Sequence, residues 1–172
     1  MNLIAYQYFE GIDLMAIEGV SEGLIMTLIA EIGLEGIRKF PTAKQFTAWL
    51  RLAPNNKISG GKVLSNHIPK GSSRLKIAFR NTANAIGNLK EGWLADFFKR
   101  LNYKKGRATA ITALARKLAV IIWNMLVKAQ NYQPPTQYLF LDEKRKLNIV
   151  KRIQKQITKF GLTNKDVEFT TS

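Results

Sequence analysis

Hydrophobic and polar positions along most of this chain recur with the period of an α-helix. Apolar residues repeat at spacings of three and four, which places them on one face of a helix. The stretches with this pattern are residues 24–32, 42–53, 73–86, 93–101, 107–133 and 142–160. Strand-like alternation is scarce, so the pattern predicts a mainly α-helical protein. The longest stripe, which follows Gly106, is expected at the centre of the core.

Residues that start or stop helices mark several of the expected boundaries. Thr42 and Gln45 have the spacing of a capping box, and Ser73 is placed to cap the helix that follows it. Pro134-Pro135 is expected to end the longest helix, and Gly161 to end the last one. The tryptophans fall on the apolar stripes and are expected in the core rather than stacked on nucleic-acid bases: Trp49, Trp93 and Trp123.

Residues 53–73 break the helical pattern with a long basic loop rich in Gly and Ser. A stretch of this length inside a compact domain is usually a functional loop or a disordered one, and a short hairpin around Gly60-Gly61 also fits it. Ser59 precedes these glycines, which leave room for a bulky phosphodiester beside its hydroxyl. Spacing alone favours a flexible basic loop over a catalytic one, and His67 is expected to be a surface residue rather than a base. The loop also carries cations that could neutralise phosphate: Lys57, Lys62, Lys70 and Arg74.

The charge balance indicates the kind of partner. The 172-residue chain has 27 Lys and Arg against 12 Asp and Glu, a formal net charge of +15, which favours a polyanion such as nucleic acid. The absence of cysteine excludes disulfides, thiolate metal sites and a cysteine nucleophile. The longest apolar run, Leu118 to Val127, is shorter than the roughly 20 residues of a membrane span, and the first residues lack the features of a signal peptide. We therefore expect a cytoplasmic protein with no membrane partner.

The turn before the first apolar helix, residues 17–23, resembles the helix-hairpin-helix element of DNA-binding proteins. In that element, glycines let backbone amides at a helix N-terminus close on a phosphate, so Gly19, Ser21 and Gly23 are candidate contacts. The match is partial, because Glu18 stands at the usual proline position and Ser21 at the second glycine. An ordinary capped turn between two helices explains this motif equally well.

A series of short motifs follows in a fixed order along the chain. They are Gly19-Val20, Ala30-Glu31-Ile32-Gly33, Phe40-Pro41-Thr42-Ala43-Lys44-Gln45-Phe46, Leu52-Ala53-Pro54, Ser59-Gly60-Gly61-Lys62, Gly71 with Leu75-Lys76, Ala115-Arg116-Lys117-Leu118-Ala119 and Trp123-Asn124-Met125-Leu126. As an ordered set they resemble the C-terminal domain of insertion-sequence transposases of the 110/116/902 group, relatives of the Piv-type DNA invertases. The resemblance runs from about Leu14 to Tyr132.

This resemblance implies a DNA recombinase that cuts and rejoins strands in transposition through a serine, which falls on Ser59 here. Attack by its hydroxyl on a scissile phosphate would leave a phosphoserine link that preserves the energy of the bond. For Arg116-Lys117, a structural role and a DNA-facing role fit the helix equally well. The full set of candidate DNA-binding residues is Gly19, Ser21, Gly23, Lys57, Gly60, Gly61, Lys62, Lys70, Gly71, Arg74, Lys76, Arg116 and Lys117.

In the family this serine works with a separate N-terminal RuvC-like domain, whose acidic residues hold divalent metal such as Mg²⁺. The acidic residues here are scattered, so we assign no metal ligand and expect the isolated chain to be inactive. The resemblance implies DNA as a partner, together with a separately supplied RuvC-like half, a guide RNA made by the element and a second copy of the chain. It also implies a bacterial or archaeal protein associated with the nucleoid.

The expected organisation has four parts. Residues 1–13 would be the end of a helical connector, 14–132 the transposase C-terminal domain, 133–161 a basic helix that adds salt-dependent affinity, and 162–172 a flexible tail. Two rival hypotheses remain at this stage. One is a non-catalytic nucleic-acid-binding module, in which Ser59 is merely a loop residue. The other is a structural protein of a ribonucleoprotein particle.

Overall fold

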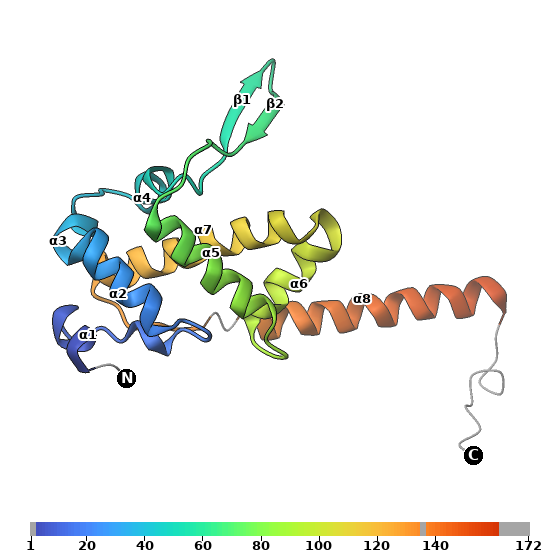
Figure 1. Cartoon of the computed structure of the whole chain (residues 1–172). Coiled ribbons are helices and arrows are strands. Elements are labelled where there is room, and N and C mark those ends of the chain that lie inside the picture. The colour runs from blue at the N-terminus through green and yellow to red at the C-terminus, as the bar shows by residue number, and fades with distance from the viewer. Residues whose placement is uncertain (1–2, 135–136, 162–172) are drawn as a thin grey trace. The chain divides into compact units, whose positions relative to one another are not determined.

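The computed structural model describes residues 3–134 and 137–161, and within them it leaves undescribed the side chains of 56–58, 63, 65–67 and 137–145 (Figure 1). The predicted tail, 162–172, therefore lies outside the described residues. The chain divides into two compact units, Met1–Gln133 and Pro134–Ser172, which are described separately here.

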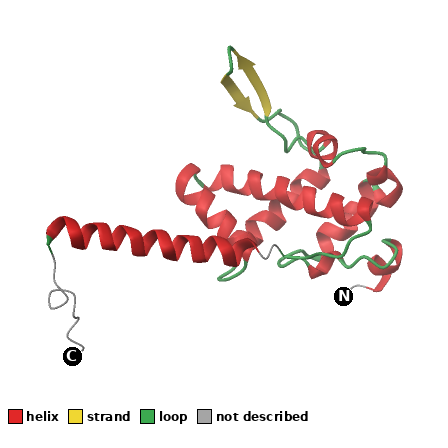
Figure 2. Cartoon of the chain, turned by 180° about the vertical axis from the view of Figure 1, so that it is seen from behind, coloured by secondary structure: helices red, strands yellow, loops and turns green. Residues whose placement is uncertain are grey.

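Helices make up most of the first unit and the described part of the second, which confirms the mainly α prediction (Figure 2). The helices of the first unit are α1 (Leu3–Tyr8), a 3-10 helix (Leu14–Ala16), α2 (Glu22–Glu31), α3 (Gly33–Arg38), α4 (Ala43–Trp49), α5 (Arg74–Gly87), α6 (Trp93–Lys105) and α7 (Arg107–Lys128). Its strands are β1 (Asn55–Ser59) and β2 (Lys62–His67), and the second unit holds α8 (Gln137–Phe160).

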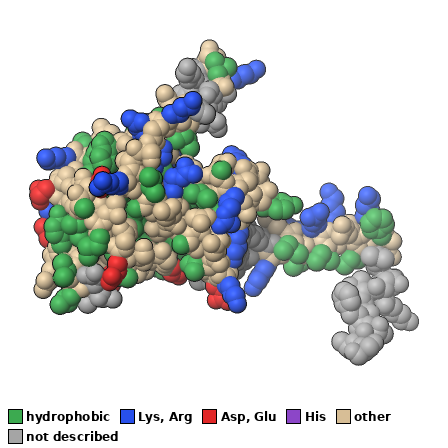
Figure 3. Space-filling view, in the orientation of Figure 1, with side chains coloured by type: hydrophobic (Ala, Val, Ile, Leu, Met, Phe, Trp, Pro, Cys, Tyr) green, Lys and Arg blue, Asp and Glu red, His purple; other side chains and the backbone are tan. Residues whose placement is uncertain are grey.

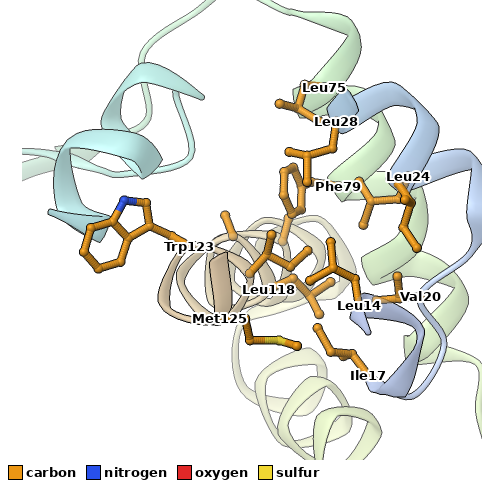
Figure 4. Close-up of a cluster of buried hydrophobic side chains, with 14 of the residues drawn as sticks. Leu14, Ile17, Val20, Leu24, Leu28, Leu75, Phe79, Leu118, Trp123 and Met125 are labelled. Carbon is orange, nitrogen blue, oxygen red and sulfur yellow. The ribbon is translucent and has the colours of Figure 1, made fainter. Parts of the chain in front are cut away.

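The longest helix of the first unit, α7, forms the centre of the core as predicted. Helices α3, α4, α5 and α6 all pack against it. Its stripe residues Leu114, Leu118 and Ile122 are fully buried, since the apolar positions at helical spacing all face these neighbours. Figure 4 shows side chains from α7, α5, α2 and the preceding turn converging on one cluster. The turn before α2 and the helices on either side of the hairpin, α4 and α5, are therefore anchored to a single core.

Helix α7 is also long and apolar enough, by length and composition alone, to cross a membrane. The sequence expectation missed this because it considered only the apolar run from Leu118 to Val127, whereas the residues before it in α7 extend the apolar window. In the structure 56% of the apolar window is buried among the neighbouring helices. Core helices pass the same compositional test, and the packing of α7 identifies it as one of these.

Two helices start at the predicted caps, while other boundaries differ. Thr42 accepts a hydrogen bond from the Gln45 amide at 3.3 Å, and Ser73 accepts one from the Lys76 amide at 3.2 Å. The longest helix ends at Lys128, before the prolines, because Ala129 takes a left-handed conformation once the apolar stripe is exhausted. Helix α8 begins at 137 rather than at 142. Gly33 was expected only to follow the helix that is α2, and in the structure it is also the first residue of α3.

The prediction that all three tryptophans belong to the core is wrong for Trp49, whose side chain is 48% exposed. Trp49 is the last residue of α4. The ring stacks on Phe46 at an interplanar angle of 17°. Trp123 is buried and donates a hydrogen bond of 3.1 Å from its Nε1 to the Phe40 carbonyl.

Part of the long basic loop forms a two-stranded antiparallel hairpin, β1 and β2 (Figure 1). The strands are joined at Gly60-Gly61, where φ is 55° and 73°, and a two-residue turn with both φ values positive is the preferred connection for a hairpin. The register changes after Lys57, so Leu64 has no partner and forms a bulge. The strands contact mainly each other, and the hairpin projects from the helical body.

Candidate nucleic-acid interface

Ser59 lies at the tip of the hairpin, where it is exposed. It is the last residue of β1, and it pairs with Lys62 across the turn. A side chain added at Gly60 or Gly61 would meet nothing within 4 Å, so the space around the turn is open. The serine hydroxyl is therefore accessible to a ligand as large as a phosphodiester.

The hairpin register separates Ser59 from His67 along the same ribbon. His67 pairs with Asn55 at the root, while Ser59 pairs with Lys62 at the tip. The intervening pairs each add about 3.4 Å, which places the two backbone positions roughly 13 Å apart. Within one chain, His67 therefore cannot serve Ser59 as a base through a direct hydrogen bond.

Two cationic side chains bind backbone carbonyls at the hairpin root, the end of the hairpin at which the chain enters β1 and leaves β2. The Arg51 guanidinium donates to the carbonyl oxygen of Lys70 at 2.6 Å, and the Lys76 ammonium donates to that of Gly71 at 2.8 Å. Gly71 has a φ of 116°, and a Cβ there would collide with the Arg51 guanidinium. Gly71, one of the motif residues noted in the sequence, thus permits the close approach of Arg51. No spacing in the sequence signals the role of Arg51, so sequence reasoning missed it.

Lys76 contributes to structure more directly than to a phosphate-binding surface. It is only 7% exposed. Burial lowers its pKa, and the nearby charges of Arg80 and Arg51 lower it further. An ammonium already bonded to a carbonyl has less to offer a phosphate than a free one.

The remaining described cations of the loop lie on the surface. Lys62 and Lys70 are exposed. Arg74 is 87% exposed and forms a long ion pair of 3.9 Å with Glu31. Such a pair is weak in water, so Arg74 can exchange this partner for a phosphate at little cost. The side chain of Lys57 lies outside the described set.

The neighbouring residues Arg116 and Lys117 have different environments. The Lys117 ammonium lies 5.1 Å from the Trp93 ring centroid and 4.9 Å from that of Phe97. Burial lowers its pKa, and the charge of Arg100 lowers it further. Lys117 is therefore held against aromatic rings. Arg116 instead lines a mostly apolar cavity of about 620 Å³ at the hairpin root.

The turn before α2 packs tightly on α5. Gly19 has a φ of 80°, and a Cβ there would lie 2.5 Å from Ile86 Cγ1, so the turn requires glycine. Ser21 is the N-cap residue of α2, yet its hydroxyl makes no capping hydrogen bond. A second cavity, of about 410 Å³, opens between α2 and α5 and is lined by Gly19, Ser21, Gly23, Leu24, Thr27, Ala78, Asn81, Thr82 and Ala85. A three-residue 3-10 helix, rather than a longer helix, precedes this turn.

The structure thus distributes the predicted contacts over three places: the hairpin tip, the hairpin root and the α2 turn. In Figure 3 the Lys and Arg side chains of the first unit are spread over the visible face and extend onto the hairpin. Among the described residues, no group of three His, Cys, Asp or Glu side chains comes together to hold a metal ion. The described residues of the first unit therefore offer exposed cations and a serine.

Comparison with known proteins adds the deciding observation. Residues 13–99 match the Transposase IS116/IS110/IS902 family, a segment that runs from the turn through the hairpin into α6. This chain belongs to that family. It is 30% identical over 129 residues to a probable family 20 transposase of Pseudomonas aeruginosa, covering 70% of this chain and 36% of that protein. It is 29% identical over 126 residues to the transposase for insertion sequence element IS1111A of Coxiella burnetii, covering 69% of this chain and 33% of that protein.

The chain therefore spans about a third of the length of these relatives. The family match includes both the α2 turn and the hairpin with Ser59. Membership in the family confirms the predicted resemblance, while the individual roles of the site residues stay predictions.

Proposed function

We propose that this chain acts in DNA transposition as the part of a transposase that binds DNA and supplies the nucleophile for strand cleavage and rejoining. Family membership supports a role in transposition. The observation that carries the choice of nucleophile is the exposed position of Ser59 at a turn with open space around both glycines. A reactive serine must reach a phosphorus atom on a bulky duplex, and this position meets that requirement.

In the proposed reaction the Ser59 Oγ attacks a scissile phosphorus atom of DNA. The Oγ–P bond forms while the bond from phosphorus to the leaving deoxyribose oxygen breaks. The serine proton passes to a base, and the released deoxyribose oxygen takes up a proton. The phosphoserine diester keeps the energy of the broken bond, so a second strand's hydroxyl can reverse the step and rejoin DNA. No oxidant or nucleotide cofactor is required.

Serine needs activation, and no described side chain contacts the Ser59 hydroxyl to provide it. We assign this task to a RuvC-like half with Mg²⁺, because a metal can stabilise developing negative charge on oxygen. The metal ligands would lie in that half, since the described residues of this chain do not gather into a metal site. The isolated chain is then expected to bind DNA without cutting it.

DNA binding in this proposal comes from several exposed cations. Lys62 lies at the tip of the hairpin, and Lys70 and Arg74 lie near its root. The α2 turn adds backbone amides at a helix N-terminus, where Gly19, Ser21 and Gly23 lie. In the second unit, α8 adds exposed basic residues, Lys146, Lys151, Arg152, Lys155 and Lys159. These contacts are expected to be independent of sequence and sensitive to salt.

A covalent assay tests the nucleophile. The chain would be joined to a RuvC-like half, incubated with element-end DNA and Mg²⁺, and separated under denaturing conditions. We expect a protein–DNA adduct that Ser59→Ala abolishes while DNA affinity stays within about twofold, because one hydroxyl contributes little to phosphate binding. The matched control is Ser72→Ala, which removes an exposed serine outside the hairpin and should keep the adduct. An adduct that persists in Ser59→Ala disproves the serine assignment.

A non-catalytic nucleic-acid-binding module is the second candidate. The observation in its favour is that Ser59 has no described side chain to act as its base, and His67 lies at the other end of the hairpin. Under this alternative the reconstituted protein binds DNA and forms no adduct. Tighter binding to folded RNA than to duplex DNA would favour a guide RNA, or a ribonucleoprotein role, as the main interaction.

The family resemblance also implies that two copies of the chain associate. Sedimentation of the chain at several concentrations tests this self-association.

A further inference from the structure

The cavity of about 620 Å³ beside the hairpin root has no role in the proposed reaction. Leu52, Pro54 and Ile68 form its hairpin side, and Phe97 comes from α6. The wall provided by α7 consists of Ala108, Thr109, Thr112, Ala113 and Arg116. Its volume lies within the range of roughly 300–1,000 Å³ that is usual for small-ligand pockets, and such pockets combine an apolar lining with a few polar groups.

Arg116, like Arg80 and Arg100, is an arginine of the first unit to which the described residues give no hydrogen bond or ion pair, and it is the one of these three that lines the cavity. Arg51 bonds to a carbonyl, and Arg107 bonds to the side chains of Asn84 and Asn88. Arg116 has no hydrogen-bond or ion-pair partner among the described residues, and it is only half-exposed at the edge of the cavity. Its guanidinium donors are therefore available to a ligand that enters the cavity.

Charges around the cavity favour an anionic ligand. The Phe97 ring, which lines it, has the Arg100 guanidinium 5.8 Å from its centroid and the Lys117 ammonium 4.9 Å away. Arg116 lines the pocket itself, and the other two cations lie against the Phe97 ring that forms part of its wall. A ligand that is flat and apolar at one end and anionic at the other matches this combination. A nucleotide has that structure.

We propose that this cavity binds one unstacked nucleotide of the DNA, with the base among the apolar side chains and its phosphate against Arg116. The inference rests on the proposed function, because it takes DNA as the substrate. Enzymes that extrude a base hold it by stacking on aromatic and apolar side chains and by hydrogen bonds to its edge. Here Phe97 and the apolar wall offer the stacking surface. Pro54 precedes β1 and Ser59 ends it, so the cavity and the serine are separated by about 17 Å of strand. For a duplex that runs along the hairpin, at about 3.4 Å per base pair, the extruded nucleotide would lie roughly five positions from the cut.

The test compares two fluorescein-labelled duplexes of equal length, one fully paired and one with a single unpaired nucleotide, by equilibrium anisotropy with the whole 172-residue chain. An unpaired nucleotide needs little energy to leave the stack, so we expect it to raise the affinity of the wild type by about tenfold. Ala113→Phe fills the cavity without altering charge, and Arg116→Gln removes the phosphate contact. Both are expected to reduce the preference to below about twofold, because each removes one half of the nucleotide's contacts.

Ala30→Phe is the matched control, because it adds the same side chain to an exposed alanine of α2 outside the cavity. It should keep the full preference, and far-ultraviolet circular dichroism would check that each variant is folded. Wild-type protein that binds both duplexes equally overturns the nucleotide site and leaves the proposed DNA function intact. Failure to bind either duplex contradicts the proposed function itself. If Ala113→Phe keeps the preference but abolishes self-association, the cavity accepts a protein side chain and the inference is wrong.

Discussion

The guanidinium of Arg51 donates a 2.6 Å hydrogen bond to the carbonyl oxygen of Lys70, although the two residues lie 19 positions apart. One precedes β1 and the other follows β2, so this bond closes the base of the hairpin. The Lys76 ammonium supports the same strand exit through the Gly71 carbonyl. The orientation of the hairpin therefore depends on cations that are already bonded within the protein.

Removing the first of these bonds should loosen the hairpin without unfolding the core. In Arg51→Ala we expect backbone amides of residues 55–67 to exchange with solvent about fivefold faster, since an exposed charged hydrogen bond contributes about 1 kcal/mol. Hydrogen–deuterium exchange read by mass spectrometry measures this. Arg74→Ala is the control, because that side chain forms only a long ion pair with Glu31. Equal exchange in both variants would show that Arg51 does not hold the root.

The tight approach of the α2 turn to α5 can be tested with two glycines that share a φ of 80°. Gly19→Ala places a methyl group 2.5 Å from Ile86 Cγ1, whereas Gly106→Ala meets nothing within 4 Å. Both variants carry backbone strain of about 1 kcal/mol, and Gly19→Ala adds overpacking of about 1–3 kcal/mol. Urea denaturation should therefore show a larger loss of stability for Gly19→Ala. Similar losses would mean that the turn moves freely away from α5.

Lys117 should make the stability of the protein depend on alkaline pH. Burial lowers its pKa in the folded state, so between that value and the ordinary pKa of lysine the unfolded chain binds more protons. Stability contributed through this residue then rises as the pH increases through that window. We expect the free energy of unfolding, measured from pH 8 to 10, to rise less steeply in Lys117→Met than in the wild type. The matched control is Lys99→Met, which removes an exposed lysine of α6.

The tryptophans at opposite extremes of exposure should respond differently to substitution. Trp123→Phe leaves the Phe40 carbonyl without its hydrogen bond and creates a small void, which should cost about 1–3 kcal/mol. Trp49→Phe keeps a ring on Phe46 and should change stability by less than about 0.5 kcal/mol. It should also remove the fluorescence most accessible to iodide, because Trp49 is 48% exposed. An unchanged iodide quenching curve would contradict this assignment.

Sequence patterns predicted the elements that are determined by residues close together in the sequence. The α7 stripe and the Thr42 and Ser73 caps each follow from a few neighbouring residues, and the Gly60-Gly61 hairpin was one of the structures that the loop sequence allowed. The errors arose where tertiary contacts decide the result. Trp49 has the same spacing as buried stripe residues, yet it lies at the end of α4 and is 48% exposed.

The candidate site was predictable only in part for the same reason. Ser59 was selected as the nucleophile through the resemblance to the transposase family, because spacing alone favoured a flexible basic loop, and its role stays a prediction. Lys76 and Lys117 were selected as cations, yet sequence does not show that a carbonyl or two aromatic rings already hold their ammonium groups. Arg51 and the cavity beside Arg116 depend on contacts between segments far apart in the chain, which no local pattern encodes.

The hairpin leaves and re-enters the body at neighbouring points, and its strands contact mainly each other. When the two ends of a segment are already close, changing the length between them costs little closure entropy. The segment from Asn55 to His67 is therefore a natural cassette for protein engineering. Hairpins of other lengths or tip sequences could be grafted between Arg51 and Lys70, and a library of such grafts would vary the reach of the arm while the helical body stays constant.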